Sequence, residues 1–127
     1  RNKIGKYIKW VDEYVSDSDI NMYFSSCDLV VLPYKKASQS GIIPIAYNYN
    51  KIILGSDIPG INEFIINKKS GYLFDSLNAE SLSEKLFYIK EKHNFKKSEL
   101  FIDEIKQQYK AEKLIFDLVS SFNANEY

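Results

Sequence analysis

Two short stretches of the chain bring together residue types that could bind a ligand. The first contains Ser38, Gln39, Ser40, Gly41 and Ile42, and it leads into a segment with a helical pattern. Backbone N–H groups at the start of a helix lack a partner within the helix, and with the helix dipole they attract anions such as phosphate. A glycine lets a ligand approach the backbone closely, and serine hydroxyls add hydrogen-bond donors. We therefore take these five residues as candidates for phosphate binding, although serine and glycine before a helix also serve simply as caps.

The second stretch, residues 57–63, places an acid and an amide after another apolar run. We expect Glu63 in the first turn of a helix, where its charge favours the helix dipole. The presence of Glu63 is therefore explained equally well by stabilisation of that helix and by contact with a ligand. Gly60 in the same stretch, and Tyr34 at the end of an earlier apolar run, complete the candidates for contacting a sugar or a nucleotide.

Several other kinds of site are not expected. His93 is the only histidine and falls in a charged run, so we interpret it as a surface residue. We predict neither a histidine-based triad nor a multi-histidine metal site, and no metal cofactor. Cys27 is the single cysteine, cannot form an internal disulfide, and is interpreted as packing. The chain contains neither a P-loop nor a G-x-G-x-x-G motif, and the catalytic residues are left unassigned.

Composition narrows the class of protein. The chain has 127 residues, the size of one domain, and we expect residues 1–127 to form a single domain. Lysine plus arginine balance aspartate plus glutamate, 17 against 17, which argues against an electrostatic nucleic-acid binder. We find no signal peptide and no apolar run long enough to cross a bilayer, so we expect a cytoplasmic protein. The chain opens with Arg1 rather than methionine, which we interpret as a boundary within a longer protein.

Strands and helices are expected to alternate. Apolar runs predict buried strands at residues 28–33, 52–56 and 72–74, and a further strand is expected near the middle of residues 6–15. Helices are predicted after Ser16, at residues 42–49, for one or two turns at 61–66, after Asn78, and at residues 97–107 and 109–122.

This alternation is typical of βαβ units around a parallel sheet. We therefore predict an α/β fold with a Rossmann-like parallel sheet flanked by helices. Ligands of such sheets bind beyond the carboxyl ends of the strands. The loops of residues 34–41 and 57–61 both follow predicted strands, so both candidate stretches are expected at that edge of the sheet.

The order of these pieces resembles the C-terminal domain of the family-4 GT-B glycosyltransferases. The matching text lies in residues 14–20, 26–34, 50–65 and 70–74, followed by the helix of residues 79–89. The resemblance implies the C-terminal half of a GT-B fold, cut from a longer enzyme whose N-terminal acceptor-binding domain is absent. It also implies that residues 38–42 face the diphosphate and the donor sugar. The short chain alone is then expected to be inactive.

As an enzyme, such a parent would transfer a hexosyl or other glycosyl group from a UDP- or GDP-sugar, with retention, to a sugar or a lipid-linked acceptor. Bacterial surface polysaccharide synthesis, of O-antigen or capsule, is the pathway that we expect. The parent would work in the cytoplasm or peripherally at the inner face of the inner membrane. The nucleotide sugar would be the substrate, with no metal required.

The chain departs from the family at one motif. Many members carry two glutamates spaced Glu-x7-Glu, the first near the sugar and the second on the ribose. Here those positions hold Ala37 and Ile45, and no glutamate occurs between Glu13 and Glu63. The family's catalytic and ribose-binding roles are therefore not carried over to this chain. A loop of amide and hydroxyl donors could still hold a diphosphate, because stabilising leaving-group charge needs donors rather than a base.

Two alternatives stay open from the sequence. The missing glutamates fit a non-catalytic nucleotide-binding Rossmann module. The apolar stripe on residues 114–122 fits a structural or protein-interaction domain that uses this helix as a docking surface.

Overall fold

The computed structural model describes residues 3–38 and 40–124. Its elements, in chain order, are the 3₁₀ turn η1 (Gly5–Tyr7), α1 (Asp17–Ser26), β1 (Leu29–Leu32), α2 (Ile42–Asn48), β2 (Ile52–Ser56), the 3₁₀ turn η2 (Asn62–Phe64), β3 (Gly71–Phe74), α3 (Ala79–Lys92) and α4 (Phe95–Ala124). No helix within the described residues combines the length and apolar character that crossing a membrane requires.

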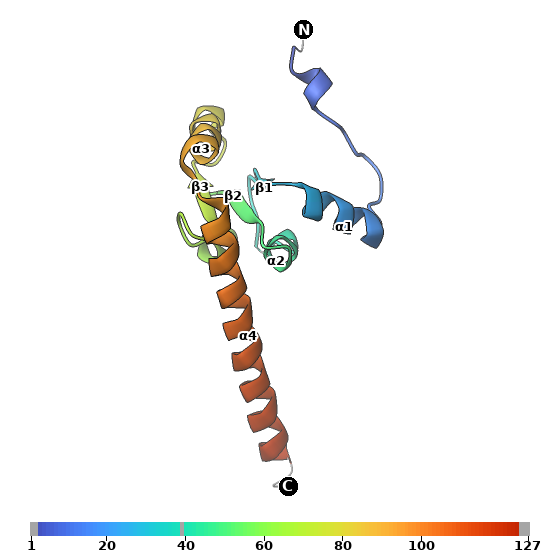
Figure 1. The fold of residues 1–127 in the computed structure, drawn as a ribbon, viewed down its shortest axis with the longest axis vertical. Helices are drawn as coiled ribbons and strands as arrows, with labels where there is room; N and C mark the ends of the chain where they lie inside the picture. Colours follow the sequence, from blue (N-terminus) through green and yellow to red (C-terminus); the bar gives the residue numbers. More distant parts are fainter. Residues whose placement is uncertain (1–2, 39, 125–127) are drawn as a thin grey trace.

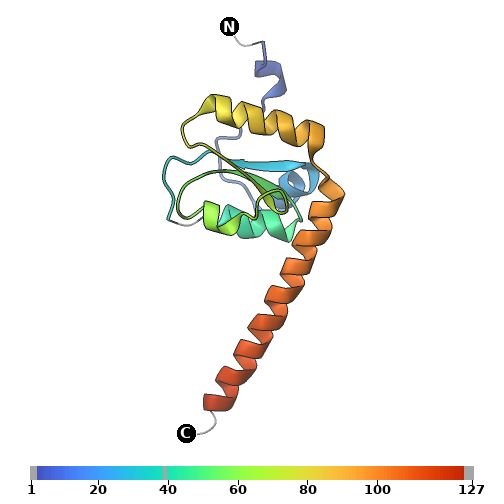
Figure 2. The same cartoon turned by 90° about the vertical axis from the view of Figure 1, so that its left-hand side faces the viewer.

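The three strands form one parallel sheet in the order β1-β2-β3. Leu29 of β1 lies opposite Ile52 of β2, and Ile53 of β2 lies opposite Gly71 of β3. The predicted α/β fold with a parallel sheet is confirmed, and the three apolar runs are its strands. Because all three strands run in one direction, the loops that follow β1 and β2 leave the same edge of the sheet (Figure 2).

Helices cover both faces of the sheet. Figure 2 shows α3 over one face and α2 with η2 over the other. Successive side chains of β2 point to opposite faces, so each face has its own core cluster. On the α2 face the buried cluster is Leu32, Ile43, Ala46, Ile53, Ile61 and Ile65. On the α3 face it is Ile52, Leu54, Tyr72, Phe74, Ile89 and Ile102.

Caps and proline set several helix starts where the sequence predicts them. The Asp19 amide donates to the Ser16 hydroxyl at the start of α1, and the Ser81 amide donates to the Asn78 side chain at the start of α3. Each side chain satisfies a backbone donor that the helix itself leaves unpaired. Helix α2 begins at Ile42, which places Pro44 in its first turn, where a missing N–H is tolerated.

The sheet edge at β1 differs from expectation. The expected strand within residues 6–15 is wrong: the described structure has η1 there, and residues 8–15 form no strand. A strand needs a neighbour to pair its backbone groups, and no described strand lies beside this segment. With no described strand on its outer side, β1 is an edge strand. It is also not buried on both faces as predicted, since its Val31 side chain is 36% exposed. Strand β2, buried at all five positions, meets the prediction.

The C-terminal region also differs. Two helices were expected at residues 97–107 and 109–122, but α4 is one continuous helix. The chain contains no glycine or proline after Gly71, so nothing in the sequence interrupts it. Ile102, near its start, is 2% exposed and belongs to the α3-face core. Figure 1 shows the rest of α4 running past the sheet and away from the other elements.

Candidate functional site

The two candidate loops lie side by side at the carboxyl edge of the sheet. Gly60, in the turn after β2, has φ +86° and is buried. A Cβ atom placed on Gly60 would lie 2.5 Å from the carbonyl oxygen of Ala37 and 2.9 Å from that of Ser38. The expectation that both loops meet at this edge is therefore confirmed, and Gly60 makes the contact with bare backbone.

Within the first loop, the described candidates differ in how they face solvent. Ser40 is 8% exposed, and its hydroxyl oxygen accepts a 3.4 Å hydrogen bond from the Ile42 amide. Ser38 is exposed, and Ile42 is half-buried against the α2-face core. Ser40 thus shapes the start of α2, whereas Ser38 offers its hydroxyl to solvent. The remaining candidate, Gln39, lies outside the described residues.

Gly41 leaves the start of α2 uncovered. Its backbone is helical, with φ −67° and ψ −16°, a conformation that any residue adopts. A Cβ atom on Gly41 would meet no atom of the described residues within 4 Å. Neither conformation nor packing in the described residues therefore requires glycine at this position. A side chain at Gly41 would therefore extend into space that no described residue fills.

Tyr34 lies at the base of the same loop. Its side chain is half-buried and packs against the α2-face core, and its carbonyl oxygen accepts a 3.5 Å hydrogen bond from the Ser76 hydroxyl. Ala37 also packs against that core. The loop is thus fixed to the core at residues 34 and 37, and its polar residues follow that anchored base.

The turn after β2 carries its own internal hydrogen bonds. The Gly60 amide donates to Oε1 of Glu63 at 3.0 Å, and Nδ2 of Asn62 donates to Oδ1 of Asp57 at 2.9 Å. Ile61 between them is fully buried. Glu63 lies in the first turn of η2, as expected, and its carboxylate is engaged by the Gly60 backbone.

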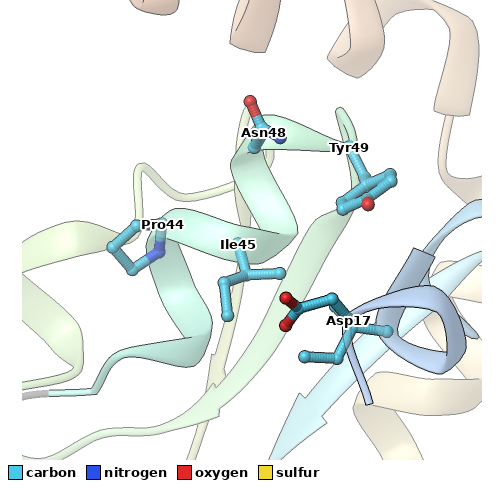
Figure 3. Close-up of a pocket in the computed structure, with 6 residues that line it drawn as sticks. Asp17, Pro44, Ile45, Asn48 and Tyr49 are labelled. Carbon is cyan, nitrogen blue, oxygen red and sulfur yellow. The ribbon is translucent and has the colours of Figure 1, made fainter.

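A groove between α1 and α2 adjoins the first loop. Its volume is about 560 Å³, and it is lined by Asp17, Ile20, Pro44, Ile45, Asn48 and Tyr49. Figure 3 shows Asp17 on α1 facing Ile45 on α2. Pro44 and Ile45 follow the candidate loop directly, so the open space before α2 and the groove lie along one helix. Asp17 and Asn48 are the polar residues in a largely apolar lining. Such a lining suits a ligand that has both apolar and hydrogen-bonding groups.

Sequence reasoning missed this groove. Asp17 is the first residue of α1, and the residues that face it come from a helix that begins 25 positions later. No spacing rule joins residues that far apart. The one available signal was Ile45 itself, which stands where many family members have a glutamate.

The histidine expectation is corrected by the structure. His93 is half-buried at the end of α3: Nδ1 lies 2.6 Å from the Tyr72 hydroxyl, and Nε2 lies 3.0 Å from the Ser98 hydroxyl. Burial lowers the pKa of the imidazole below its ordinary value. Tyr72 belongs to the α3-face core, so this network joins β3, α3 and α4 away from the α2-face groove. The charged residues beside His93 in the sequence suggested an exposed side chain. The contact with Tyr72, 21 residues earlier, has no local signal.

Burial shifts the pKa of two further side chains, Cys27 and Tyr47. Burial raises the pKa of the Cys27 thiol, which lies 3.6 Å from the Phe24 carbonyl oxygen in a half-buried position. Burial likewise raises the pKa of Tyr47, whose hydroxyl is 2.7 Å from the Phe64 carbonyl oxygen. Within the part of the chain that the structure describes, no three histidine, cysteine or acidic residues gather as metal ligands would.

Comparison with known families identifies the fold and the family. The family model of the glycosyl transferases group 1 matches residues 4–108. This chain belongs to that family. The resemblance to the donor-binding half of GT-B glycosyltransferases is thereby confirmed over most of the chain. A search of curated proteins found no match.

Solved structures show the same fold. HepE of Anabaena, solved in complex with UDP, matches with a TM-score of 0.64 and 18% identity over 82% of this chain and 30% of its own. Sucrose-phosphate synthase of Thermosynechococcus elongatus matches with a TM-score of 0.58 and 14% identity, over 76% of this chain and 28% of its own. A glycosyltransferase of Rickettsia africae matches with a TM-score of 0.57 and 20% identity, over 79% of this chain and 30% of its own. This chain therefore spans less than a third of the length of each.

The two positions of the family's glutamate pair are apolar in structure as well as in sequence. Ala37 packs against the α2-face core, and Ile45 lines the groove. Neither side chain can donate or accept a proton. Acid–base catalysis and hydrogen bonding to ribose hydroxyls are therefore closed to these two side chains.

Proposed function

We propose that this chain is the nucleotide-sugar-binding half of a retaining glycosyltransferase. Membership of the glycosyl transferases group 1 family over residues 4–108 is the observation that carries the proposal. The adjoining loops at the carboxyl edge of the sheet support it, because ligands of parallel α/β sheets bind at that edge. The groove along α2 offers a place for the rest of the ligand. The UDP bound to HepE, a structure of the same fold, favours a UDP-sugar over a GDP-sugar as the donor.

In this proposal the diphosphate lies against residues 38–42. The unobstructed space at Gly41 admits it to the first-turn amides of α2, and Ser38 supplies an exposed hydroxyl. The exposed pair Lys35 and Lys36 adds positive charge to the same loop. Ser40 acts through its hydrogen bond to the Ile42 amide, by holding the start of α2 in shape.

The nucleoside lies in the groove between α1 and α2. Ile20, Ile45 and Tyr49 give apolar and aromatic contact to the base and the ribose face, and Asp17 accepts hydrogen bonds from ribose hydroxyls. The donor sugar then extends from the diphosphate toward Tyr34 and Gly60. Amide and hydroxyl donors around the leaving diphosphate stabilise the charge that develops on it, with no metal ion needed.

The rest of the enzyme completes the reaction. A preceding domain supplies the acceptor site, and the acceptor is a sugar or a lipid-linked glycan of bacterial surface polysaccharide synthesis, such as O-antigen or capsule. The protein works in the cytoplasm or peripherally at the inner face of the inner membrane. No nucleic acid is a partner: positive and negative side chains balance, 17 against 17.

Ligand titration tests the proposal. UDP, GDP and NAD are added separately to the isotope-labelled chain, and amide chemical shifts are followed. We expect shifts at Ser38, Gly41 and Asp17 with UDP, and weaker or no shifts with NAD. Shifts with NAD alone would assign the chain to a different class of Rossmann domain, and no response to any nucleotide would favour the protein-interaction alternative.

Activity is measured on the chain joined to its preceding domain. Transfer of sugar from a UDP-sugar to an acceptor is the expected result. A protein that binds UDP at Ser38 and Gly41 but transfers no sugar from any donor would instead be the non-catalytic nucleotide-binding module.

A further inference from the structure

We propose that Glu63 is a positioning residue, which holds the Gly60 turn against the Ala37–Ser38 backbone. It thereby sets the shape of the first candidate loop (residues 34–41, hereafter the donor loop) without touching the donor. This inference rests on the proposed function. It differs from the two roles that the sequence left open for Glu63, namely stabilisation of a helix dipole and direct contact with the sugar or nucleotide.

The first step is the bond between Glu63 and Gly60. The Gly60 amide donates to Oε1 of Glu63 at 3.0 Å, three residues along the chain. A carboxylate is a stronger acceptor than a neutral oxygen, so the bond resists opening. Glu63 is exposed while Gly60 is buried. The side chain therefore reaches back from the surface to hold a buried amide, and one of its two oxygens is occupied there.

The second step is the contact between Gly60 and the donor loop. At φ +86° Gly60 adopts the left-handed region, which the absence of a Cβ allows. The same absence lets its α-carbon lie directly against the carbonyl groups of Ala37 and Ser38. No side chain intervenes, so a shift of Gly60 cannot be absorbed by a rotamer change. The backbone of the donor loop must follow it.

The third step is that the rest of the turn is fixed. Ile61 is fully buried in the α2-face core, and the Ile58 carbonyl oxygen accepts from the amides of Ile61 and Asn62 at 3.2 and 3.0 Å. The turn is therefore anchored on the far side of Gly60. Glu63 supplies the hydrogen bond at Gly60 itself, at the point of contact with the loop.

The dipole explanation is weak in this structure. The turn η2 has only three residues, so few peptide dipoles align along it. The Glu63 carboxylate is hydrogen-bonded to Gly60 rather than to an amide of η2. Its contribution is therefore to the shape of the turn.

Simple electrostatics and positioning predict opposite effects of removing Glu63. Deleting a negative charge near a phosphate site strengthens the binding of an anion if charge alone acts. Positioning predicts that Glu63→Ala weakens UDP binding, on the order of three- to tenfold, because one charge-assisted hydrogen bond is lost and the loop is no longer held. Glu63→Gln removes the charge but keeps an oxygen that accepts from the Gly60 amide, so it binds UDP as well as the unchanged chain or more tightly.

The experiment compares Glu63→Ala, Glu63→Gln and the control Glu84→Ala, which removes an exposed acid from α3. Affinities for UDP and for UDP-glucose, used as probes, are measured by titration calorimetry. Amide shifts of Ala37 and Ser38 are measured without ligand. We expect Glu63→Ala to weaken both probes equally and to move the two amide signals, Glu63→Gln to restore both readouts, and the control to change neither.

Two results would overturn the inference. Unmoved Ala37 and Ser38 signals in ligand-free Glu63→Ala would show that Glu63 does not hold the loop. Weakened binding of UDP-glucose with unchanged binding of UDP would show that Glu63 contacts the sugar instead. If the unchanged chain binds no UDP, the proposed function fails. The ligand-free shifts then still report whether Glu63 holds the loop.

Discussion

At the scale of single residues, two glycines at one edge of the sheet have opposite reasons to be glycine. Gly60 is required by the structure, because its φ is +86° and a Cβ atom would collide with the backbone of the donor loop. Gly41 is not required, because its backbone is helical and a Cβ atom would meet open space. Gly60 is therefore explained by the fold, whereas Gly41 is explained by the proposed approach of a ligand.

Replacing Gly60 with alanine is expected to lower both stability and ligand binding. The left-handed backbone and the displaced loop cost about 1–3 kcal/mol of the free energy of unfolding. Urea unfolding followed by circular dichroism measures the loss, and a UDP titration measures binding.

Gly41→Ala is the matched control and is expected to behave differently. Its free energy of unfolding should stay within about 1 kcal/mol of the unchanged chain, since only the preference at a helix start is altered. Its affinity for UDP should fall, because the new methyl group occupies the space before α2. Full UDP affinity in Gly41→Ala would remove the close approach of phosphate from the proposal.

At the scale of elements, the groove lies between α1 and α2, and Asp17 of α1 is one of the residues that line it. Asp17→Trp places a large ring in the groove and is expected to reduce UDP binding by more than tenfold if the nucleoside lies there, a loss above 1.4 kcal/mol. Asp17→Asn keeps the volume and one acceptor, so its loss should be smaller. Equal affinity in Asp17→Trp and the unchanged chain, measured by calorimetry, would place the nucleoside elsewhere.

The joint between α3 and α4 makes stability depend on pH through His93. Burial lowers the imidazole pKa in the folded chain below the ordinary 6.5, so the folded state favours the neutral ring. Above pH 6.5 the ring is neutral in both states and adds no pH dependence. As pH falls through 6.5 towards the folded pKa, the unfolded chain takes up the proton first and the free energy of unfolding decreases.

His93→Gln is expected to remove this part of the pH dependence. Urea midpoints are measured for both proteins between pH 8 and pH 5, and the difference between them isolates the histidine from the carboxylates. The Gln variant should become relatively more stable as pH falls. A difference that stays constant with pH would mean that burial of His93 does not penalise its charged form.

At the scale of the whole molecule, the sheet and the outer part of α4 are nearly independent. Ile102 lies in the core, whereas Ile115, Phe116 and Leu118 are 61%, 70% and 61% exposed. These side chains form an apolar surface of the kind that a partner domain covers. The core of the sheet does not use them.

A chain that ends at residue 108 is therefore expected to keep the fold. Its midpoint of thermal unfolding should lie within a few degrees of that of the full chain, and its tendency to associate should fall. A chain that ends at residue 97 loses Ser98 and Ile102 and should be clearly less stable. Thermal unfolding and analytical ultracentrifugation measure the two effects. A large loss of stability in the longer variant would show that the outer helix supports the core.

Local signals in the sequence were enough for the three strands and for the starts of α1, α2 and α3. The apolar runs at residues 52–56 and 72–74, the caps at Ser16 and Asn78, and Pro44 in the first turn of α2 all depend on neighbours within a few positions. Such features are determined by the chain itself, because periodicity, capping and proline geometry act over one or two turns.

Features that depend on distant partners were decided only by the tertiary structure. Residues 8–15 have strand-forming composition, yet they form no strand and leave the outer edge of β1 unpaired by any described strand. His93 is half-buried because Tyr72 and Ser98 meet it, and the groove exists because α1 lies beside α2. The contact of Gly60 with Ala37 joins two loops more than 20 residues apart. Local patterns cannot specify such contacts, since each depends on how the sheet and its helices are stacked in space.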